Sequence, residues 1–431
     1  MLKSKKLLII GIISFSLIIS SIFYIIILSE NNLTSTSRDN DSETPQDPLI
    51  LENTPKGVRL TLIHNYNDSI IISWYTEKSA TDPNLVYSTN AALSSAIEIT
   101  PNSTQITSTT FIYYAEIVNL LPNTTYHYQV SSDDNNKREI MNFTTLANKD
   151  VSNITFLVYG DSRTQRLERR ILAEKIMESF RNKFEFIVHT GDIVEDGIDQ
   201  NEWNNYFSDT EVLNAYKQGV YVEGNHERGN SNTKMYDNLL MYGTQNNRYY
   251  YFSYGGIGFI ILNSNSYTVG DDDQTNWLNN TLIQISQKNS YNFAFLHHPL
   301  LHSRSYDYHR EQWRPLFDKY NITCVFCGHN HHYERSYPMT NSSKLEYDNS
   351  ERYNYTNLNE SIYIVTGGAG APLYEVNNDN FVAKSEKAYH FLLVDVKKES
   401  TKTSISLESW GMPNDFGALY LIDNITLTKF I

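Results

Sequence analysis

The stretch TCVFCGHNHHYERS, residues 323–336, starts as a short apolar run and continues into Gly328, His329, Asn330 and His331. Such a run is typical of a strand buried on both faces, and the glycine lets the backbone turn sharply where the strand ends. Four other stretches also consist of an apolar run that leads into glycine, aspartate or histidine. They are ITFLVYGDSR (154–163), FEFIVHTGD (184–192), GVYVEGNHE (219–227) and NFAFLHHP (292–299).

A helix is predicted between the first two of these runs. Leu167, Ile171, Ile176 and Phe180 are spaced so that they fall near one face of a helix, as a crossover between two parallel strands requires. Strands that alternate with helical segments in this way predict an α/β domain.

The polar residues share one position relative to their strands, the carboxyl end. In open α/β sheets this edge is where ligands bind, so loops far apart in the sequence are expected to converge there. Carboxylates suit hard cations, and imidazoles suit Zn, Fe, Mn or Ni. The sequence therefore predicts a metal site built from several loops.

The order Asp, Gly-Asp, Gly-Asn-His-Glu, His, Gly-His-x-His resembles that of the calcineurin-like metallophosphoesterases. GHNHHYERS at 328–336 is similar to the last motif of the purple acid phosphatases in particular, which also carry a fibronectin-like module ahead of the catalytic domain. The resemblance implies two mixed sheets packed together and flanked by helices. It also implies two divalent or mixed-valence first-row metal ions, with Fe, Zn and Mn left open. The implied ligands are Asp161, Asp192 and His331 for the first ion and Asn225, His297 and His329 for the second, with Asp192 bridging the two.

The activity implied by the resemblance is hydrolysis of a phosphate ester by attack of a metal-bound hydroxide. His226, which is not a ligand in the family, is placed to stabilise the transition state or to protonate the leaving oxygen, and orienting a ligand is the alternative. His298 is interpreted as structural. In the segment HSRSYDYHREQW, His302 and His309 are candidate substrate contacts.

Two positions depart from the family pattern. Glu195 stands where purple acid phosphatases have the tyrosine that binds ferric iron, so the purple chromophore should be absent. Arg163 stands where those enzymes have glycine and other metallophosphoesterases often have histidine, which leaves the fourth ligand of the first ion open. Glu195 is a possible extra ligand. Arg163 is a candidate phosphate contact, and pairing with a local carboxylate is the alternative.

The chain before residue 153 divides into three parts. Residues 57–147 hold short strands separated by polar turns, which predicts a β-sandwich similar to a fibronectin type III module, with Trp74 on an early strand and Tyr126 or Tyr128 at the tyrosine corner. Residues 29–56 have the composition of a flexible tether. The catalytic domain is expected at 153–431.

Residues 7–28 carry no charge and are long enough to cross a hydrocarbon core of about 30 Å as a helix. Lys3, Lys5 and Lys6 precede them, which predicts a single-pass anchor with its N-terminus in the cytoplasm. Residues 1–28 then form a cytoplasmic stub and the membrane span, and the catalytic domain is extracytoplasmic. Secretion after signal cleavage is the alternative.

Charge and cysteine content narrow the function classes. Lys and Arg number 35 against 49 Asp and Glu, a net charge of −14 that argues against nucleic-acid binding and leaves a small-molecule phosphate ester as the expected substrate. Cys324 and Cys327 are too far apart on one strand for a disulfide.

The competing function is a membrane-tethered binding or adhesion protein with a degraded metallophosphoesterase domain.

Overall fold

The computed structural model describes most of the chain after residue 52. The described residues are 53–62, 68–148, 151–228, 234–241, 248–268, 272–286, 288–301, 309–340, 353–377 and 379–430. The predicted anchor at 7–28 and nearly all of the tether lie outside them. In the described part of the chain, no helix is both long and apolar enough to span a membrane.

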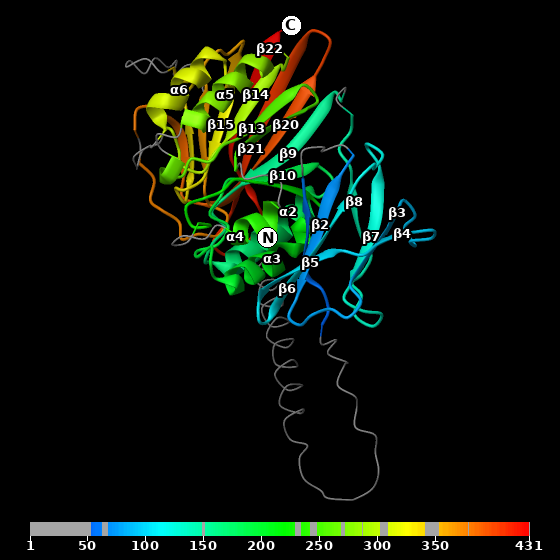
Figure 1. Cartoon of the computed structure of the whole chain (residues 1–431). Coiled ribbons are helices and arrows are strands. Elements are labelled where there is room, and N and C mark those ends of the chain that lie inside the picture. Colours follow the sequence, from blue (N-terminus) through cyan, green and yellow to red (C-terminus); the bar gives the residue numbers. More distant parts are fainter. Residues whose placement is uncertain are drawn as a thin grey trace, which may run out of the picture. The chain divides into compact units, whose positions relative to one another are not determined.

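The N-terminal residues form the predicted sandwich of two antiparallel layers (Figure 1). Trp74 is fully buried between the layers, and the Tyr126 hydroxyl accepts a hydrogen bond of 2.9 Å from the backbone of Leu121, which identifies Tyr126 as the corner tyrosine. One layer runs in the order β1 (Lys56–Thr61), β2 (Ile70–Thr76), β6 (Thr110–Ile117) and β5 (Asn102–Thr107). The other runs β4 (Ile97–Ile99), β3 (Asn84–Ser88), β7 (Thr125–Ser131) and β8 (Met141–Thr144).

The C-terminal domain contains two mixed sheets that pack face to face, as the resemblance implies. Phe156 of the first sheet contacts Phe259 and Phe293 of the second, with ring centroids 5.2 and 5.7 Å apart. The first sheet holds β17 (Asn354–Thr356), β22 (Tyr420–Phe430), β21 (Lys402–Met412), β20 (Tyr389–Lys398), β9 (Asn153–Tyr159), β10 (Phe186–His189) and β11 (Gln218–Tyr221). The second holds β12 (Tyr250–Tyr254), β13 (Ile257–Ile261), β14 (Tyr291–Phe295), β15 (Cys324–Cys327), β18 (Ile362–Thr366), β16 (Tyr333–Ser336) and β19 (Val382–Glu386).

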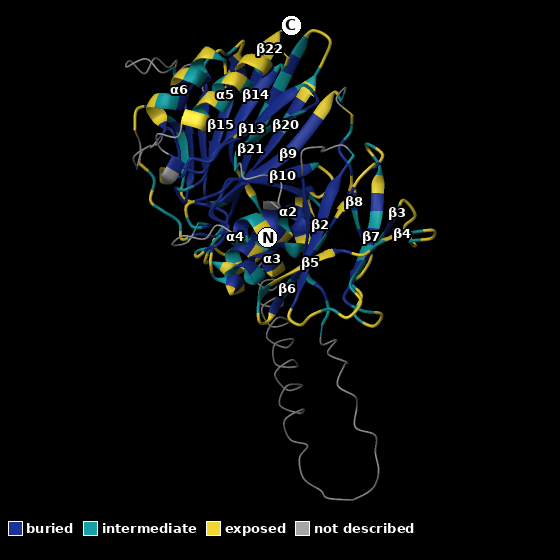
Figure 2. Cartoon of the chain, in the orientation of Figure 1, coloured by how far each residue is buried: buried dark blue, intermediate teal, exposed yellow. Residues whose placement is uncertain are grey.

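Helices cover the outer faces of this pair of sheets, and their outward surfaces are the exposed ones (Figure 2). The predicted crossover helix exists, and Ile176 and Phe180 are buried, but Leu167 is 45% exposed, so the predicted apolar face is wrong at its first position. Leu172, Ala173 and Met177 complete the buried face instead. The helices are α2 (Arg166–Phe180) and α3 (Gln200–Asn214) beside the first sheet, α5 (Asp272–Ile285) and α6 (Arg310–Lys319) beside the second, and the short α4 (Lys234–Tyr236), which continues into a π-helical turn at Asp237–Met241.

The two domains share one continuous sheet, because β1 of the sandwich pairs in parallel with β11. Glu211 on α3 accepts hydrogen bonds from the backbone of Gly57 and Val58, and the fully buried Arg59 donates to the carbonyl of Leu239 at 3.0 Å. These contacts hold the sandwich against the edge of β11, the strand that leads to Asn225.

Candidate metal centre

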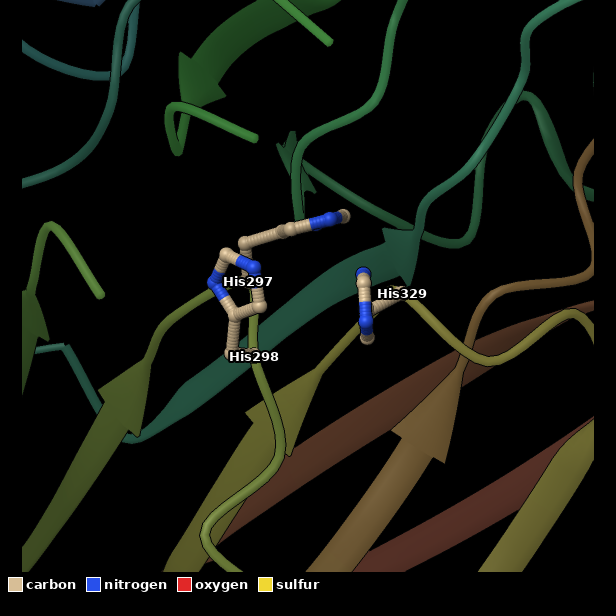
Figure 3. Close-up of side chains that lie close together, drawn as sticks. All are labelled: His297, His298 and His329. Atoms are coloured by element: carbon tan, nitrogen blue, oxygen red, sulfur yellow. The ribbon is translucent and has the colours of Figure 1, made fainter. Parts of the chain in front are cut away.

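All five predicted motifs lie just beyond strand ends, as expected. Strands β9, β10 and β11 run parallel in the first sheet, and β14 and β15 run parallel in the second, so that their carboxyl ends meet. Figure 3 shows His297, His298 and His329 side by side beyond these strand ends, although they come from two different loops.

The backbone at three predicted ligands has an uncommon conformation. Asp161, Asp192 and His329 have φ angles of 56°, 53° and 69°, in the left-handed region. Residues other than glycine adopt this region at some cost, and they do so often at functional sites. Gly191 has φ 95°, and an added Cβ there would lie 2.8 Å from the backbone of Gly224, so the two loops pack too closely for any other residue.

Two buried carboxylates form the negative part of the site. Asp161 is fully buried and Asp192 is 1% exposed. Burial raises the pKa of Asp161 to about 7, against the opposing charge of His297. Burial would also raise the pKa of Asp192, but the nearby His297 and His226 hold it well below its usual range. Asp192 Oδ2 is buried and has no hydrogen-bond donor among the described residues, and it faces the Arg163 guanidinium, whose Nε lies 3.5 Å away.

The imidazoles are oriented by backbone carbonyls. His297 Nδ1 lies 2.9 Å from the oxygen of Thr190, and His331 Nδ1 lies 2.8 Å from the oxygen of Pro372. A carbonyl oxygen can only accept, so each Nδ1 carries a proton, and Nε2 is the ring atom that faces the site and can offer its lone pair to a metal once it is unprotonated. Such outer hydrogen bonds are typical of histidines that bind metals.

The predicted ligands of the second ion converge. His297 Nε2 and His329 Nδ1 each lie 3.1 Å from Asn225 Oδ1, and His297 Nε2 lies 3.1 Å from Asp192 Oδ1. Burial would lower the pKa of His297, but Asp192 and Asp161 raise it to about 9. The same carboxylates would attract a metal ion, which competes with that proton. These four side chains fit one first-row ion.

His298 lies close to this set without the same orientation. Atoms of His297, His298 and His329 that could bind a metal lie within 4.8 Å of one another. However, His298 Nδ1 is 3.1 Å from the Ser264 hydroxyl, which also accepts a hydrogen bond from the His298 backbone. Burial lowers the pKa of His298 to about 2, so its ring is neutral. These contacts favour the structural interpretation of His298.

The first-ion residues are brought together, but Arg163 lies among them. Its Nη2 is 3.1 Å from His331 Nε2 and its Nε is 3.5 Å from Asp192 Oδ2. Its Nη1 forms an ion pair with Glu195. The two departures from the family pattern therefore form an ion pair, which is the alternative that the sequence left open for Arg163, and Glu195, the possible extra ligand, contacts the guanidinium.

His226 borders the site without joining the ligand set. Its Nδ1 donates to the carbonyl of Glu195 at 2.6 Å, and its Nε2 faces Asp192 Oδ2 at 3.8 Å. The side chain is 23% exposed, so it can reach a substrate that enters from solvent.

Two further residues support the site: Glu227, and Tyr374, which the sequence did not indicate. The buried carboxylate of Glu227 accepts hydrogen bonds from the backbone of Asp192, Ile193 and Gly224, which fixes two ligand loops relative to each other. Tyr374 stacks on His331 with ring centroids 4.1 Å apart. The glycine-rich run GGAGAP at 367–372, directly after a strand, was the available signal for this loop.

The two candidate substrate contacts have different outcomes. His302 lies outside the described residues. His309 is buried, stacks on Trp313 at 4.0 Å and is hydrogen-bonded to Thr268 at 3.0 Å. These contacts assign His309 to the packing of α6 and correct the expected substrate contact.

Comparison with known proteins identifies both domains. Residues 154–333 match the calcineurin-like phosphoesterase family, and residues 55–145 match the purple acid phosphatase N-terminal domain. A phosphoenolpyruvate phosphatase of Allium cepa is 24% identical to this chain, in an alignment that covers 86% of this chain and 81% of the length of that protein. A probable inactive purple acid phosphatase 1 of Arabidopsis thaliana is 26% identical over 46% of this chain and 36% of its own. The structure of purple acid phosphatase PPD1 from yellow lupin shares the fold, with a TM-score of 0.73 and 18% identity over 88% of this chain and 75% of that one.

Proposed function

We propose that this chain, which joins a purple acid phosphatase N-terminal domain to a calcineurin-like phosphoesterase domain, is a metal-dependent hydrolase of phosphate esters. One observation carries the proposal most. The buried Asp192 and His297 and the partly exposed His329 converge with Asn225 on one point, and a hydrogen bond from Nδ1 of His297 to the Thr190 carbonyl leaves Nε2 as the atom that can bind a metal. A small-molecule phosphate ester is the substrate class that fits the domain.

A metal ion held by Asp192, Asn225, His297 and His329 would neutralise charge on the phosphate and acidify a water molecule. The chain itself supplies orientation and charge. Glu227 fixes the loops of Asp192 and Gly224, and Thr190 holds the His297 ring. Arg163 presents a planar cation that matches two phosphate oxygens, and His226 is positioned to donate a proton or to stabilise developing charge.

We also propose that the protein is anchored in a membrane by residues 7–28, with the catalytic domain on the extracytoplasmic side. The support is the uncharged apolar run and the lysines that precede it. The membrane is the expected partner through this segment.

A protein loaded with iron is expected to lack a visible tyrosinate-to-iron absorption band. The reason is that Glu195 stands at the position of the family tyrosine and forms an ion pair with Arg163. The measurement is an absorption spectrum of the iron-loaded protein. A purple preparation would contradict this, and loss of its colour on Tyr374→Phe would then identify Tyr374, beside His331, as the iron-bound residue.

The second candidate function is binding or adhesion by a degraded domain. The Arg163–Glu195 pair favours it, because it alters the surroundings of the first ion. Hydrolysis of a panel of chromogenic phosphate monoesters and diesters with Mn, Zn or Fe separates the two functions. Turnover of any ester supports the hydrolase, and a metal-loaded protein inert to the whole panel supports the binding protein.

A further inference from the structure

The guanidinium of Arg163 occupies the region where a first metal ion would be bound. It contacts Asp192 and His331, two of the three residues predicted to hold that ion, and Glu195, the candidate for an additional ligand. Its side chain is only 12% exposed, so it points into the site rather than into solvent.

Nε2 of His331 can bind either the Arg163 guanidinium or a metal ion, but not both. Nδ1 of His331 donates to the carbonyl of Pro372, so in the neutral ring Nε2 has a single lone pair in the ring plane. Arg163 Nη2 donates to that lone pair at 3.1 Å. An ion bound to Nε2 would need the same lone pair, so the two cannot be bound together.

The second-ion residues do not depend on Arg163. Asn225 Oδ1 is contacted by His297 and His329, and His297 Nε2 reaches the Oδ1 atom of Asp192, whereas Arg163 faces Oδ2. Asp161 accepts the backbone N–H of His329 at 2.9 Å and so helps to position one of these ligands.

We infer that the Arg163 guanidinium, held by Glu195, replaces the first metal ion, so that this chain binds one ion, at Asp192, Asn225, His297 and His329. The inference rests on the proposed function and specifies its active centre. Asp192, Asn225, His297 and His329 would hold one divalent ion, and this ion and the fixed guanidinium would together neutralise the phosphate, as two ions do in binuclear enzymes.

The test is the metal content of the folded protein after reconstitution with Mn or Zn and removal of free metal. We expect about one ion per chain in the wild type and about two in Arg163→Gly and Arg163→His, because both variants free His331, and the histidine adds a ligand. Arg170→Ala is the matched control, since Arg170 lies on α2, 53% exposed beside Glu174, and its loss should leave one ion. Circular dichroism verifies that each variant is folded.

His331→Ala tests the same inference without removing the arginine. The ion count should stay at about one, because His331 binds Arg163 and not a metal, and the electron paramagnetic resonance of bound Mn²⁺ should be that of an isolated ion. Two ions in the wild type, or one ion in both Arg163 variants, would overturn the inference.

Ester turnover, measured on the same samples, distinguishes failure of this inference from failure of the proposed function. A chain with two ions that hydrolyses esters contradicts only this inference, whereas a chain with one ion that hydrolyses none contradicts the proposed function.

Discussion

Asp192→Asn is expected to remove bound metal and to lower ester turnover by roughly a thousandfold. Asp192 is buried, reaches His297 with one oxygen and leaves the other without a hydrogen-bond donor among the described residues. A neutral amide keeps the shape but lacks the charge that attracts the ion. The measurements are metal content and steady-state kinetics on the same preparation.

The control for this variant is Asp196→Asn. Asp196 lies in the same loop but is exposed, and its Oδ1 accepts a backbone hydrogen bond of 3.1 Å from Ile198 that asparagine can also accept. This change should leave both metal and turnover intact. Full metal content in Asp192→Asn would remove Asp192 from the role of ligand.

His226→Ala is expected to keep its metal and to lose roughly a hundredfold in turnover, the effect of removing a positioned proton donor or charge stabiliser. The His226 ring is fixed by the carbonyl of Glu195 and is partly exposed, whereas the neighbouring Asn225 contacts two of the histidines that are predicted to bind metal. Asn225→Ala should therefore lose metal instead. The measurements are metal content and kinetics with esters of different leaving groups.

The leaving-group series distinguishes the roles of His226. If it is a proton donor, the loss should be small for nitrophenyl esters, whose leaving group needs no proton, and larger for alkyl esters. An equal loss across the series would assign His226 to stabilisation of transition-state charge. Loss of metal from His226→Ala would make the residue structural and would contradict both roles.

The sequence predicted the loops of the site because each one combines two local signals. A buried strand is visible as an apolar run, and a glycine followed by a polar residue marks its end, as at Gly160-Asp161 and Gly328-His329. The prediction of the buried helix face was less accurate. Leu167 has the predicted spacing but lies in the first turn of α2, where its side chain is exposed to solvent, and spacing alone does not show this.

The relations between distant residues could not be predicted. The sequence left open that Arg163 pairs with a local carboxylate, but only the fold shows that this carboxylate is Glu195. The carbonyls of Thr190 and Pro372, which fix the histidine tautomers, are backbone groups and leave no signature in the sequence. The pairing of β1 with β11, which joins the sandwich to the first sheet of the C-terminal domain, depends on tertiary structure in the same way.

The most direct test of a metal-dependent phosphoesterase centre at Asp192 is a metal titration of hydrolysis. The purified chain is stripped with a chelator, and release of nitrophenol from a phosphate ester is measured as Mn, Zn or Fe is added. We predict no turnover in the stripped protein, recovery to a plateau as metal binds, and no recovery in Asp192→Asn. Turnover that survives complete removal of metal, or metal bound through Asp192 without any turnover, would contradict the account.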